Sequence, residues 1–449
     1  MATSLEQVAD EFTIAPFSAE RYLAELHETD LIRHNGKVSQ VIGVVIESNG
    51  PAMSVGETCE IRYKRNEQTV IAEVVGFRDN KVLLMPLGEL GGIGAGAEVK
   101  ALGRPLDVAL SPSLLGRVLD GLGRPIDDGG EILAEIKAPT VATPPDPLQR
   151  PRVTEALALG IRAIDAMLTC GKGQRVGIFA GSGVGKSTVL GMIARNTAAD
   201  VNVIALVGER GKEVRDFIER DLGEEGLRRS VVVVATSDQP ALIRIKAAFV
   251  AMTIAEYFRD QGLDVIFMMD SVTRFAMAQR EVGLAIGEPT TTRGYTPSVF
   301  AQLPKLLERA GTSTAGTITG LYSVLVDGDD INEPISDACR AILDGHIVLS
   351  RALASANHYP AIDILQSVSR VMPDVTDEAH QSASSAVRDI LATYREAEDL
   401  VNIGAYVAGS NPRIDLAIAK IESIRHFLRQ AIREGSSYED SLRGLYAVA

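Results

Sequence analysis

Residues 175–190 read RVGIFAGSGVGKSTVL, and this stretch decides the fold of the 449-residue chain. The apolar run RVGIFA is typical of a buried strand, and the residues from Ser187 onward are typical of a helix. A glycine-rich loop between a strand and a helix matches the P-loop pattern, which binds nucleotide phosphates. Ala180 stands where the strict pattern has glycine. We expect this position to close the strand without a positive φ, so that a small side chain suffices.

The loop supplies the groups that a nucleotide's phosphates require. Gly181, Gly183 and Gly185 let the backbone amides turn inward, beside the N-terminus of the following helix. Lys186 places a positive charge between the β- and γ-phosphates, and the Ser187 hydroxyl is a suitable Mg²⁺ ligand. A glycine-rich turn with a chance lysine is the alternative, and the flanking strand and helix favour the P-loop. The predicted nucleotide-binding residues are Gly181, Ser182, Gly183, Val184, Gly185, Lys186, Ser187 and Thr188.

Asp270 closes the apolar run VIFMMD, which is the usual Walker B position. There a carboxylate holds Mg²⁺, commonly through water, and we expect it beside Ser187. Aspartate is also a good N-cap for the helix that follows, so the residue pattern allows both interpretations. The P-loop upstream favours the metal site.

Glu209 follows the strand-like run VIALV. A carboxylate at the end of a neighbouring strand can face the γ-phosphate and orient the attacking water. The adjacent Arg210 can contact phosphate or orient the glutamate. Glu213, Arg215 and Asp216 are more typical of a solvated helix face. Residue types alone leave Glu209 open between a catalytic residue and a surface residue.

The stretch HYPAIDILQSVSRV, residues 358–371, carries two further candidates. Arg370 lies far beyond the P-loop in the sequence. An arginine near a γ-phosphate stabilises charge in the transition state and is sometimes supplied by a neighbouring subunit. The spacing leaves a structural ion pair equally open. Tyr359 can stack on adenine, although its pattern favours a core aromatic.

The rest of the chain divides into three patterns. A helical pattern at 18–34 precedes short strand-like runs that indicate a small β-barrel, ending at the turn-like GGIGAGAE. Apolar runs then alternate with helices, which predicts a mostly parallel sheet covered on both faces. The last part is helical, with a break at AGSNPR, residues 408–413. The predicted domains are 1–101, 102–378 and 379–449.

Composition indicates a globular protein with a net charge of −14. An acidic balance disfavours a general nucleic-acid binder. The three scattered cysteines, Cys59, Cys170 and Cys339, are typical of buried free thiols in a reducing compartment. The N-terminus lacks the apolar core of a signal peptide, and no apolar run reaches the ~18 residues of a membrane helix. A cytoplasmic location is therefore expected.

These motifs together resemble a known family. The chain is similar to the catalytic-type subunits of the rotary ATPase superfamily in four motifs, AGSGVGKST, GERGKEV, MMDSVTRFA and PAIDILQSVS. Within this superfamily, the chain resembles the flagellar and type III secretion ATPases in GRVLDGLGRPID and in residues 287–311 and 325–351. The resemblance spans nearly the whole chain and implies a RecA-like α/β core with a mostly parallel sheet, an N-terminal β-barrel and a C-terminal α-helical domain.

The resemblance also implies roles for the candidate residues. By position, Lys186 and Ser187 match nucleotide and Mg²⁺ ligands, and Asp270 matches the Walker B aspartate. Glu209 matches the catalytic carboxylate and Arg210 the arginine beside it. Arg370 matches the arginine finger that reaches the next subunit's site. Tyr359 matches the aromatic residue beside adenine. The chain departs from synthase β-subunits at GAYVAGSNPR, where those carry an acidic stretch, so a synthase-like rotor contact is not implied.

The function implied is Mg²⁺-dependent ATP hydrolysis by a homohexameric ring that assists flagellar-type protein export, in the cytoplasm at the inner face of the membrane. The implied partners are a regulator at the N-terminal region, a central stalk protein, export chaperones and substrates, and the export gate, with no specific nucleic acid. The closest alternative is the catalytic subunit of a proton-translocating rotary ATPase. A non-catalytic pump subunit would lack Glu209 or an intact P-loop. A hexameric RNA helicase would need a base-stacking barrel, and this barrel has few aromatics, Tyr63 and Phe77 among them.

Overall fold

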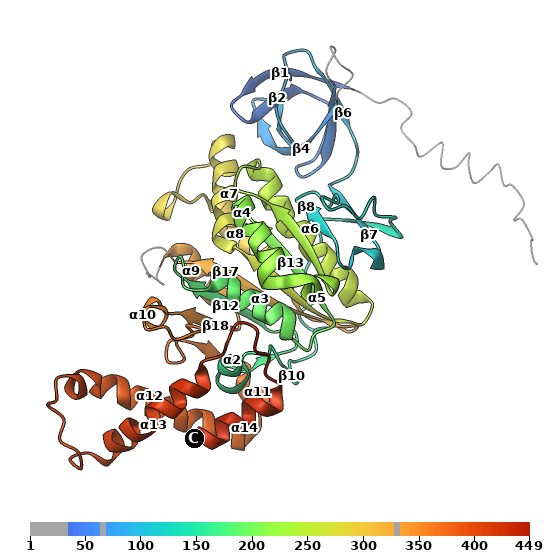
Figure 1. Cartoon of the computed structure of the whole chain (residues 1–449). Coiled ribbons are helices and arrows are strands. Elements are labelled where there is room, and N and C mark those ends of the chain that lie inside the picture. Colours follow the sequence, from blue (N-terminus) through green and yellow to red (C-terminus); the bar gives the residue numbers. More distant parts are fainter. Residues whose placement is uncertain (1–34, 63–68, 327–332) are drawn as a thin grey trace, which may run out of the picture.

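The computed structural model describes residues 35–62, 69–326 and 333–449. Three parts follow one another along the molecule: a barrel, a sheet-based core and a group of C-terminal helices at the end opposite the barrel (Figure 1). The helix predicted at 18–34 lies outside the described residues. Within them, no helix is both long and apolar enough to cross a membrane. The predicted domain boundaries stay a prediction.

The N-terminal part is a closed six-stranded barrel with the strand order β1-β2-β5-β4-β3-β6. Its strands enclose apolar side chains such as Ile46, Ile61 and Leu84, all fully buried. The small barrel predicted from the sequence is confirmed, and GGIGAGAE is a turn before β6. The strands are β1 Gly36–Ile42, β2 Val45–Asn49, β3 Thr58–Arg62, β4 Thr69–Arg78, β5 Lys81–Pro86 and β6 Glu98–Ala101.

The core is a nine-stranded sheet with the order β19-β18-β12-β17-β15-β13-β14-β8, to which β16 adds beside β17. All neighbouring pairs between β18 and β8 in this order are parallel, and only β16 and β19 run antiparallel. The predicted mostly parallel sheet is confirmed. The strands are β8 Val118–Asp120, β12 Arg175–Ala180, β13 Val201–Val207, β14 Ser230–Ala235, β15 Asp264–Asp270, β16 Gly311–Thr312, β17 Thr317–Leu325, β18 Gly345–Leu349 and β19 Val368–Ser369.

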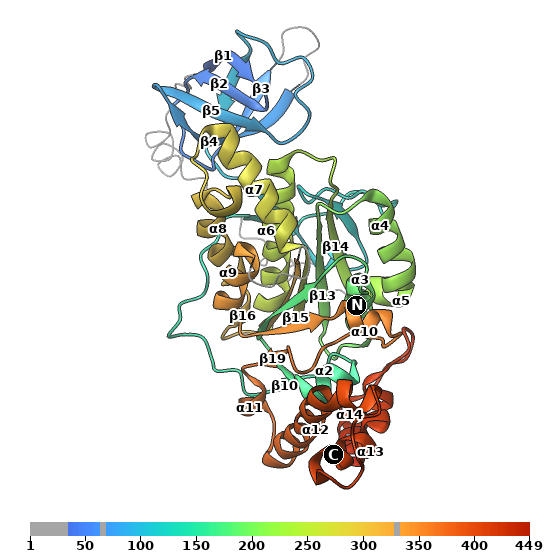
Figure 2. The same ribbon diagram turned by 90° about the vertical axis from the view of Figure 1, so that its left-hand side faces the viewer.

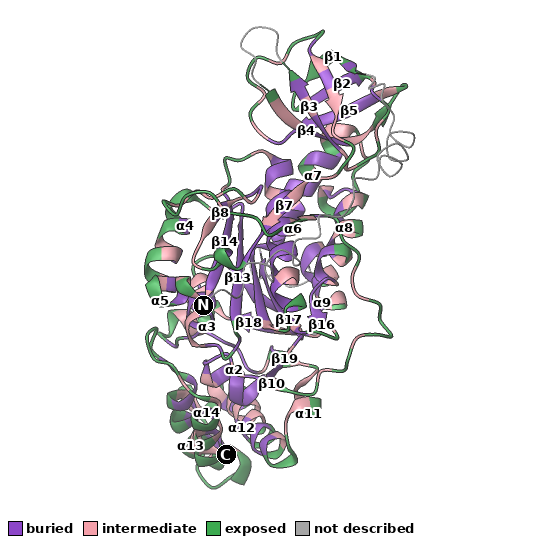
Figure 3. Cartoon of the chain, turned by 90° about the vertical axis from the view of Figure 1, so that its right-hand side faces the viewer, coloured by how far each residue is buried: buried purple, intermediate pink, exposed green. Residues whose placement is uncertain are grey.

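Helices cover both faces of this sheet, and the central strands are buried throughout (Figures 2 and 3). This double burial explains why the strands read as continuous apolar runs rather than alternating ones. One face carries α6 Ala241–Asp260, α7 Val272–Ile286, α8 Pro297–Leu307 and α9 Pro334–Ile342. The other carries α3 Lys186–Asn196 and the consecutive segments α4 Gly211–Asp216, η2 Phe217–Leu222 and α5 Gly223–Arg228.

The C-terminal part consists of α12 Glu378–Asn402, α13 Pro412–Leu428 and α14 Tyr438–Val448. The predicted break is confirmed, because Asn411 caps α13 and Pro412 begins it. These helices pack on the short α2, Arg162–Met167, beneath the sheet. The remaining elements are η1 Pro112–Leu114, η3 Thr292–Gly294, α10 Arg351–Ser355, α11 Met372–Val375, and the paired strands β7 Asp107–Leu110 with β9 Ile136–Pro139 and β10 Ala156–Leu157 with β11 Cys170–Gly171.

Buried ion pairs fix the parts to one another. Lys246 on α6 pairs with Glu73 on the barrel strand β4, and both side chains are buried. Arg309, after α8, is 1% exposed. It donates from Nε to Glu256 on α6 at 2.8 Å and from Nη1 to the carbonyl of Thr140 at 2.8 Å. A buried charge is tolerated only with such partners, so Arg309 connects α6 to the segment after β9.

Replacing Arg309 should therefore destabilise the core. Arg309→Met leaves Glu256 without its cation and should lower the free energy of unfolding by about 3–5 kcal/mol. Arg309→Met combined with Glu256→Leu should recover most of that loss, because no unpaired charge remains. Arg215→Met removes an exposed pair with Glu219 and should cost only about 0.3–0.5 kcal/mol. Urea denaturation followed by circular dichroism measures all three, and equal losses for Arg309→Met and Arg215→Met would contradict the assignment.

Candidate active site

The P-loop lies at the carboxyl end of β12. Ala180 is the last residue of that strand and has no positive φ, as expected from the sequence. Gly183 and Gly185 have φ values of 78° and 94°, a region that favours glycine. Gly185 is the N-cap of α3, which begins at Lys186. A Cβ built on Gly183 would meet no atom within 4 Å, so glycine is required there by its positive φ and not by lack of space.

Three charged side chains meet above this loop. The Lys186 ammonium forms an ion pair with Asp270 Oδ1 and lies 3.6 Å from Glu209 Oε1. Glu209 follows β13 and Asp270 ends β15, and because the strands are parallel, their carboxyl ends reach one edge. Ser323 on β17 donates a 2.7 Å hydrogen bond to Asp270 Oδ1. The structure therefore brings together the three residues that the sequence singled out.

The N-cap interpretation of Asp270 is wrong. Ser271 is the N-cap of α7, and its hydroxyl accepts a hydrogen bond from the backbone N–H of Arg274. Asp270 is 3% exposed and directs its carboxylate to Lys186 and Ser323 instead. Its place at the end of β15 leaves it available to the P-loop rather than to the helix.

Burial and charge shift the titration of these groups. Desolvation raises the pKa of Glu209 to about 7, and the negative charges of Asp270 and Glu213 add to this, against the opposing effect of Lys186. Desolvation alone would lower the pKa of Lys186, yet the Asp270 and Glu209 carboxylates outweigh it and raise that pKa. Glu209 Oε1 is buried and has no hydrogen-bond partner among the described residues. Such an oxygen is an acceptor that a water molecule can satisfy.

The same residues fit a magnesium ion. No group of three or more His, Cys, Asp or Glu side chains in the described ranges is arranged as a metal cage. Mg²⁺ bound to a nucleotide does not need one, since it keeps several waters and takes one or two protein oxygens besides the phosphates. Ser187, in the first turn of α3, and the buried carboxylate of Asp270 are oxygen donors of this kind.

Tyr359 lies beside the P-loop. Its ring is 3.8 Å from the position that a Cβ on Gly185 would take. The residue is 42% exposed, so the interpretation as a core aromatic is wrong. It lines a hollow of about 770 Å³ together with Phe427 and Gln430 from the C-terminal part. The backbone N–H of Gln430 donates to the Tyr359 carbonyl at 2.9 Å, which fixes the position of this segment.

Arg370 lies at the opposite edge of the sheet. It follows β19, whose Ser369 pairs with Gly345 at the start of β18. Because β18 is parallel to β12, the start of β18 is remote from the P-loop, and β12 itself is roughly 17 Å long at ~3.3 Å per residue. The exposed Arg370 side chain donates to the Arg340 carbonyl at 3.3 Å. The P-loop of the same chain is thus beyond its reach.

Arg210 directly follows Glu209 in the sequence, but its side chain is largely in solvent. Its side chain is 80% exposed and lies 4.0 Å from Glu213. Glu213 and Arg215 are exposed on α4, in agreement with a solvated helix face, although Glu213 also raises the pKa of Glu209.

Two residues at the site were missed from the sequence. Ser323 is the one serine in the apolar run GLYSVLV, and a small hydroxyl in such a run is a signal that a buried polar contact exists there. Arg274 lies four residues after Asp270, in the first turn of α7, and its stem packs against Gly208, just before Glu209. Its Nε is buried without a hydrogen-bond partner in the described part of the chain. Arg274 belongs to the first turn of the helix that follows the strand ending at Asp270, and this place just after the strand end was the available signal.

Family models match successive parts of the chain. The ATP synthase alpha/beta family beta-barrel domain matches residues 38–103, and the nucleotide-binding domain of the same family matches residues 160–369. The T3SS EscN ATPase C-terminal domain matches residues 376–447. Together these models follow the barrel, the core and the C-terminal helices of the structure.

Individual proteins match over almost their full length. A flagellum-specific ATP synthase of Bacillus subtilis (strain 168) is 56% identical over 420 residues, covering 93% of this chain and 95% of the relative. A type 3 secretion system ATPase of Xanthomonas euvesicatoria is 52% identical over 416 residues, covering 93% and 94%. The assembled ATPase EscN from the enteropathogenic E. coli type III secretion system matches with a TM-score of 0.87 at 46% identity, covering 92% of this chain and 99% of that one.

These matches confirm the resemblance inferred from the motifs, and the fold that it implied. The chain belongs to the flagellum-specific ATP synthases and type III secretion ATPases, which are ATP-hydrolysing enzymes of the ATP synthase alpha/beta family.

Proposed function

We propose that the chain hydrolyses MgATP at the P-loop with Glu209 orienting the attacking water. The observation that supports this most is the buried Oε1 of Glu209, which accepts no hydrogen bond from the described residues and lies 3.6 Å from the Nζ of the P-loop Lys186. In-line attack on a γ-phosphate needs an acceptor for a water proton and a cation beside the phosphate, and these two side chains supply both.

The remaining residues bind and position the nucleotide. The backbone amides from Gly181 to Gly185 and the N-terminus of α3 receive phosphate oxygens. Ser187 and Asp270 hold Mg²⁺, which neutralises phosphate charge when it is bound. Tyr359 stacks on the adenine end, since its exposed ring lies next to Gly185. Arg210 is exposed and lies 4.0 Å from Glu213. Its positive charge beside Glu209 offsets part of the negative charge of the two glutamates.

Arg370 acts on the neighbouring subunit's site. It is exposed at the sheet edge opposite its own P-loop, so a ring is needed to bring it to a γ-phosphate. Cyclic symmetry supplies one such arginine to every site. The relative EscN is described as assembled, and we infer a homohexameric ring for this chain.

The ring energises or assists flagellar-type protein export. EscN has also been solved in complex with its central stalk EscO, and we infer a stalk partner here. Export chaperones and substrates, the export gate at the inner face of the membrane, and a regulator at the N-terminal region complete the proposed partners. The match to the T3SS EscN ATPase C-terminal domain favours this function over a proton-translocating pump subunit. The RNA helicase alternative would need aromatic side chains on the barrel surface that stack on bases. Of the two aromatics named from the sequence, Phe77 is 55% exposed on the barrel, and Tyr63 lies outside the described residues.

Replacing the proposed water-orienting carboxylate should abolish turnover but not binding. Glu209→Gln should lower kcat by ~10²–10⁴ while the Kd for ATP changes by only a few fold, because the amide cannot accept the proton. Glu219→Gln, an exposed glutamate of η2, is the matched control and should keep the normal rate. Phosphate release and nucleotide titration measure the two quantities. Normal hydrolysis by Glu209→Gln would contradict the assignment.

The raised pKa of Glu209 should be visible in the pH dependence. Below a pKa of about 7 the carboxyl is protonated and cannot accept a proton, so kcat/KM should fall as pH drops through that value. Glu213→Gln removes a charge that raises this pKa, and the fall should then begin at lower pH. A profile in which Glu213→Gln leaves the midpoint in place would contradict the electrostatic account.

Mixed rings should reveal whether Arg370 works across subunits. Arg370→Ala and Lys186→Ala rings should each be nearly inactive, since an arginine finger is worth roughly 10³–10⁵ in rate. Rings mixed from both variants contain interfaces in which an intact Arg370 meets an intact P-loop, and should regain activity. Mass photometry confirms mixed assembly. Assembled mixed rings without hydrolysis would argue against a finger supplied in trans.

A further inference from the structure

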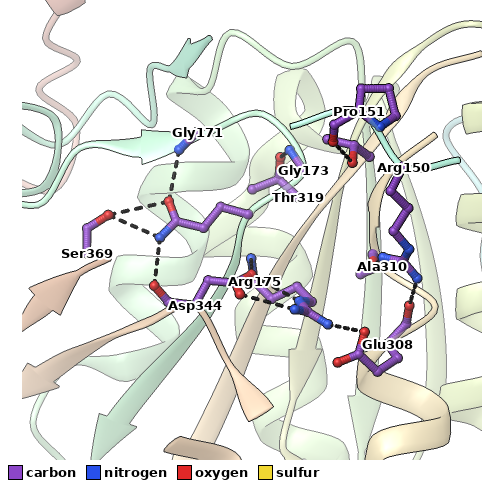
Figure 4. A network of polar contacts seen from close by, with 12 residues as sticks. Arg150, Pro151, Gly171, Gly173, Arg175, Glu308, Ala310, Thr319, Asp344 and Ser369 are labelled. Carbon is purple, nitrogen blue, oxygen red and sulfur yellow. Dashed lines mark hydrogen bonds and ion pairs between the residues drawn. The ribbon is translucent and has the colours of Figure 1, made fainter. Parts of the chain in front are cut away.

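The backbone of Arg370 is fixed to the strand that carries the P-loop, at its opposite end. The Arg370 N–H donates to the carbonyl of Asp344 at 3.0 Å. Asp344 is in turn held by Arg175, the first residue of β12, through contacts of 3.0–3.1 Å from the Arg175 backbone N–H, Nε and Nη2 to its carboxylate. Figure 4 shows the contacts of Arg175 with Asp344, and Ser369, the residue before Arg370, nearby. Through Asp344 the start of β12 is linked to the backbone of the residue proposed as the arginine finger.

Gln174 connects the remaining parts of this network. Its side chain is fully buried and bonds three separate segments. Oε1 accepts from the Gly171 N–H at 2.9 Å, and Nε2 donates to Ser369 Oγ at 3.1 Å and to the Asp344 carbonyl at 3.3 Å. The Ser369 hydroxyl donates onward to the carbonyl of Thr169 at 2.8 Å. The amide of Gln174 therefore holds both Ser369, the residue before Arg370, and Asp344, whose carbonyl accepts from the Arg370 N–H, while its oxygen is bonded to Gly171.

The packing around these bonds leaves little room for β19 to shift. A Cβ on Gly345 would lie 2.6 Å from the Val368 carbonyl oxygen and 3.3 Å from Gln174 Nε2. The two strands and the glutamine thus touch at van der Waals contact. In contrast, the Arg370 side chain is exposed. The network accordingly fixes where Arg370 begins and leaves its guanidinium to reach outward.

We propose that Gln174 is a positioning residue for Arg370, and sets where that arginine enters the neighbouring subunit's active site. The proposal rests on the proposed function of Arg370 across the subunit interface. Transition-state stabilisation by a finger depends on placement, since a displacement of ~1 Å can cost roughly 10² in rate. Gln174 acts on the active site of the adjoining subunit, whereas a purely structural role would act on its own P-loop through β12.

Mixed rings separate these two roles. Lys186→Ala subunits serve as donors, because they keep Arg370 but lack the P-loop lysine. Arg370→Ala subunits serve as acceptors, because they keep the P-loop but supply no finger. Gln174→Met is introduced into either the donor or the acceptor, at the same mixing ratio, with assembly checked by mass photometry. Gln279→Met in the donor is the matched control, since Gln279 is another buried glutamine, on α7, bonded to Ser298.

In the donor, Gln174→Met should lower kcat of the mixed ring by about tenfold or more, with the KM for ATP little changed, because the nucleotide is bound by the acceptor. The same substitution in the acceptor should have a much smaller effect, since that subunit has no finger to position. Gln279→Met in the donor should keep the unmodified rate. If Gln174→Met donors do not enter rings, Ser369→Ala donors give the same comparison, because this change removes the hydroxyl that links Gln174 to Thr169.

The outcomes distinguish the two levels of the hypothesis. Assembled rings of the two parent variants without hydrolysis would overturn Arg370 as a finger in trans, and the role of Gln174 with it. Active parent rings in which the donor substitution has no effect, or in which donor and acceptor substitutions have equal effects, would overturn the role of Gln174 alone. A donor-specific loss of kcat supports it.

Discussion

The active site depends on one buried ammonium group placed among carboxylates. Lys186 forms an ion pair with Asp270 and lies 3.6 Å from Glu209. Without that cation, two carboxylates at this depth would repel each other and favour protonation, and the pKa of Glu209 is already raised to about 7 with the lysine present. Lys186 therefore balances the negative charge of these carboxylates at the P-loop. The backbone around it has to hold all three groups at one point.

The order of strands in the sheet provides that point. The strands β12, β17, β15 and β13 are neighbours in the sheet, in that order. Their carboxyl ends therefore place the P-loop, Ser323, Asp270 and Glu209 side by side in the same order. Ser323 lies between the P-loop and the Walker B position, and its 2.7 Å hydrogen bond orients the Asp270 carboxylate toward Lys186. Parallel pairing aligns the carboxyl ends, so a shift of one strand would separate the charges that need each other.

The sequence indicated the local part of this arrangement but not its non-local part. The strand before the P-loop, the helix after it and the acids at two strand ends follow from apolar runs and residue types close in sequence. Strand order, by contrast, depends on pairings across the whole core, so Ser323 as a partner of Asp270 could not be derived. Tyr359 was ambiguous for the same reason, because its surroundings include Gln430 from another part of the chain, whose N–H donates to the Tyr359 carbonyl. The short strands β8 and β19 gave patterns too brief to separate from loops.

The direction of the strands also explains why the proposed mechanism requires a ring. β12 carries the P-loop at its carboxyl end and, at its amino end, Gln174 and Arg175, which hold the segment that leads into Arg370. An extended strand of this length cannot bring both of its ends to one nucleotide site. In the proposed ring, each subunit therefore receives an arginine from one neighbour and offers its own to the other. In that proposal hydrolysis is a property of the interface, because the groups proposed to bind ATP and the arginine proposed to stabilise its transition state lie at opposite ends of the strands of one sheet.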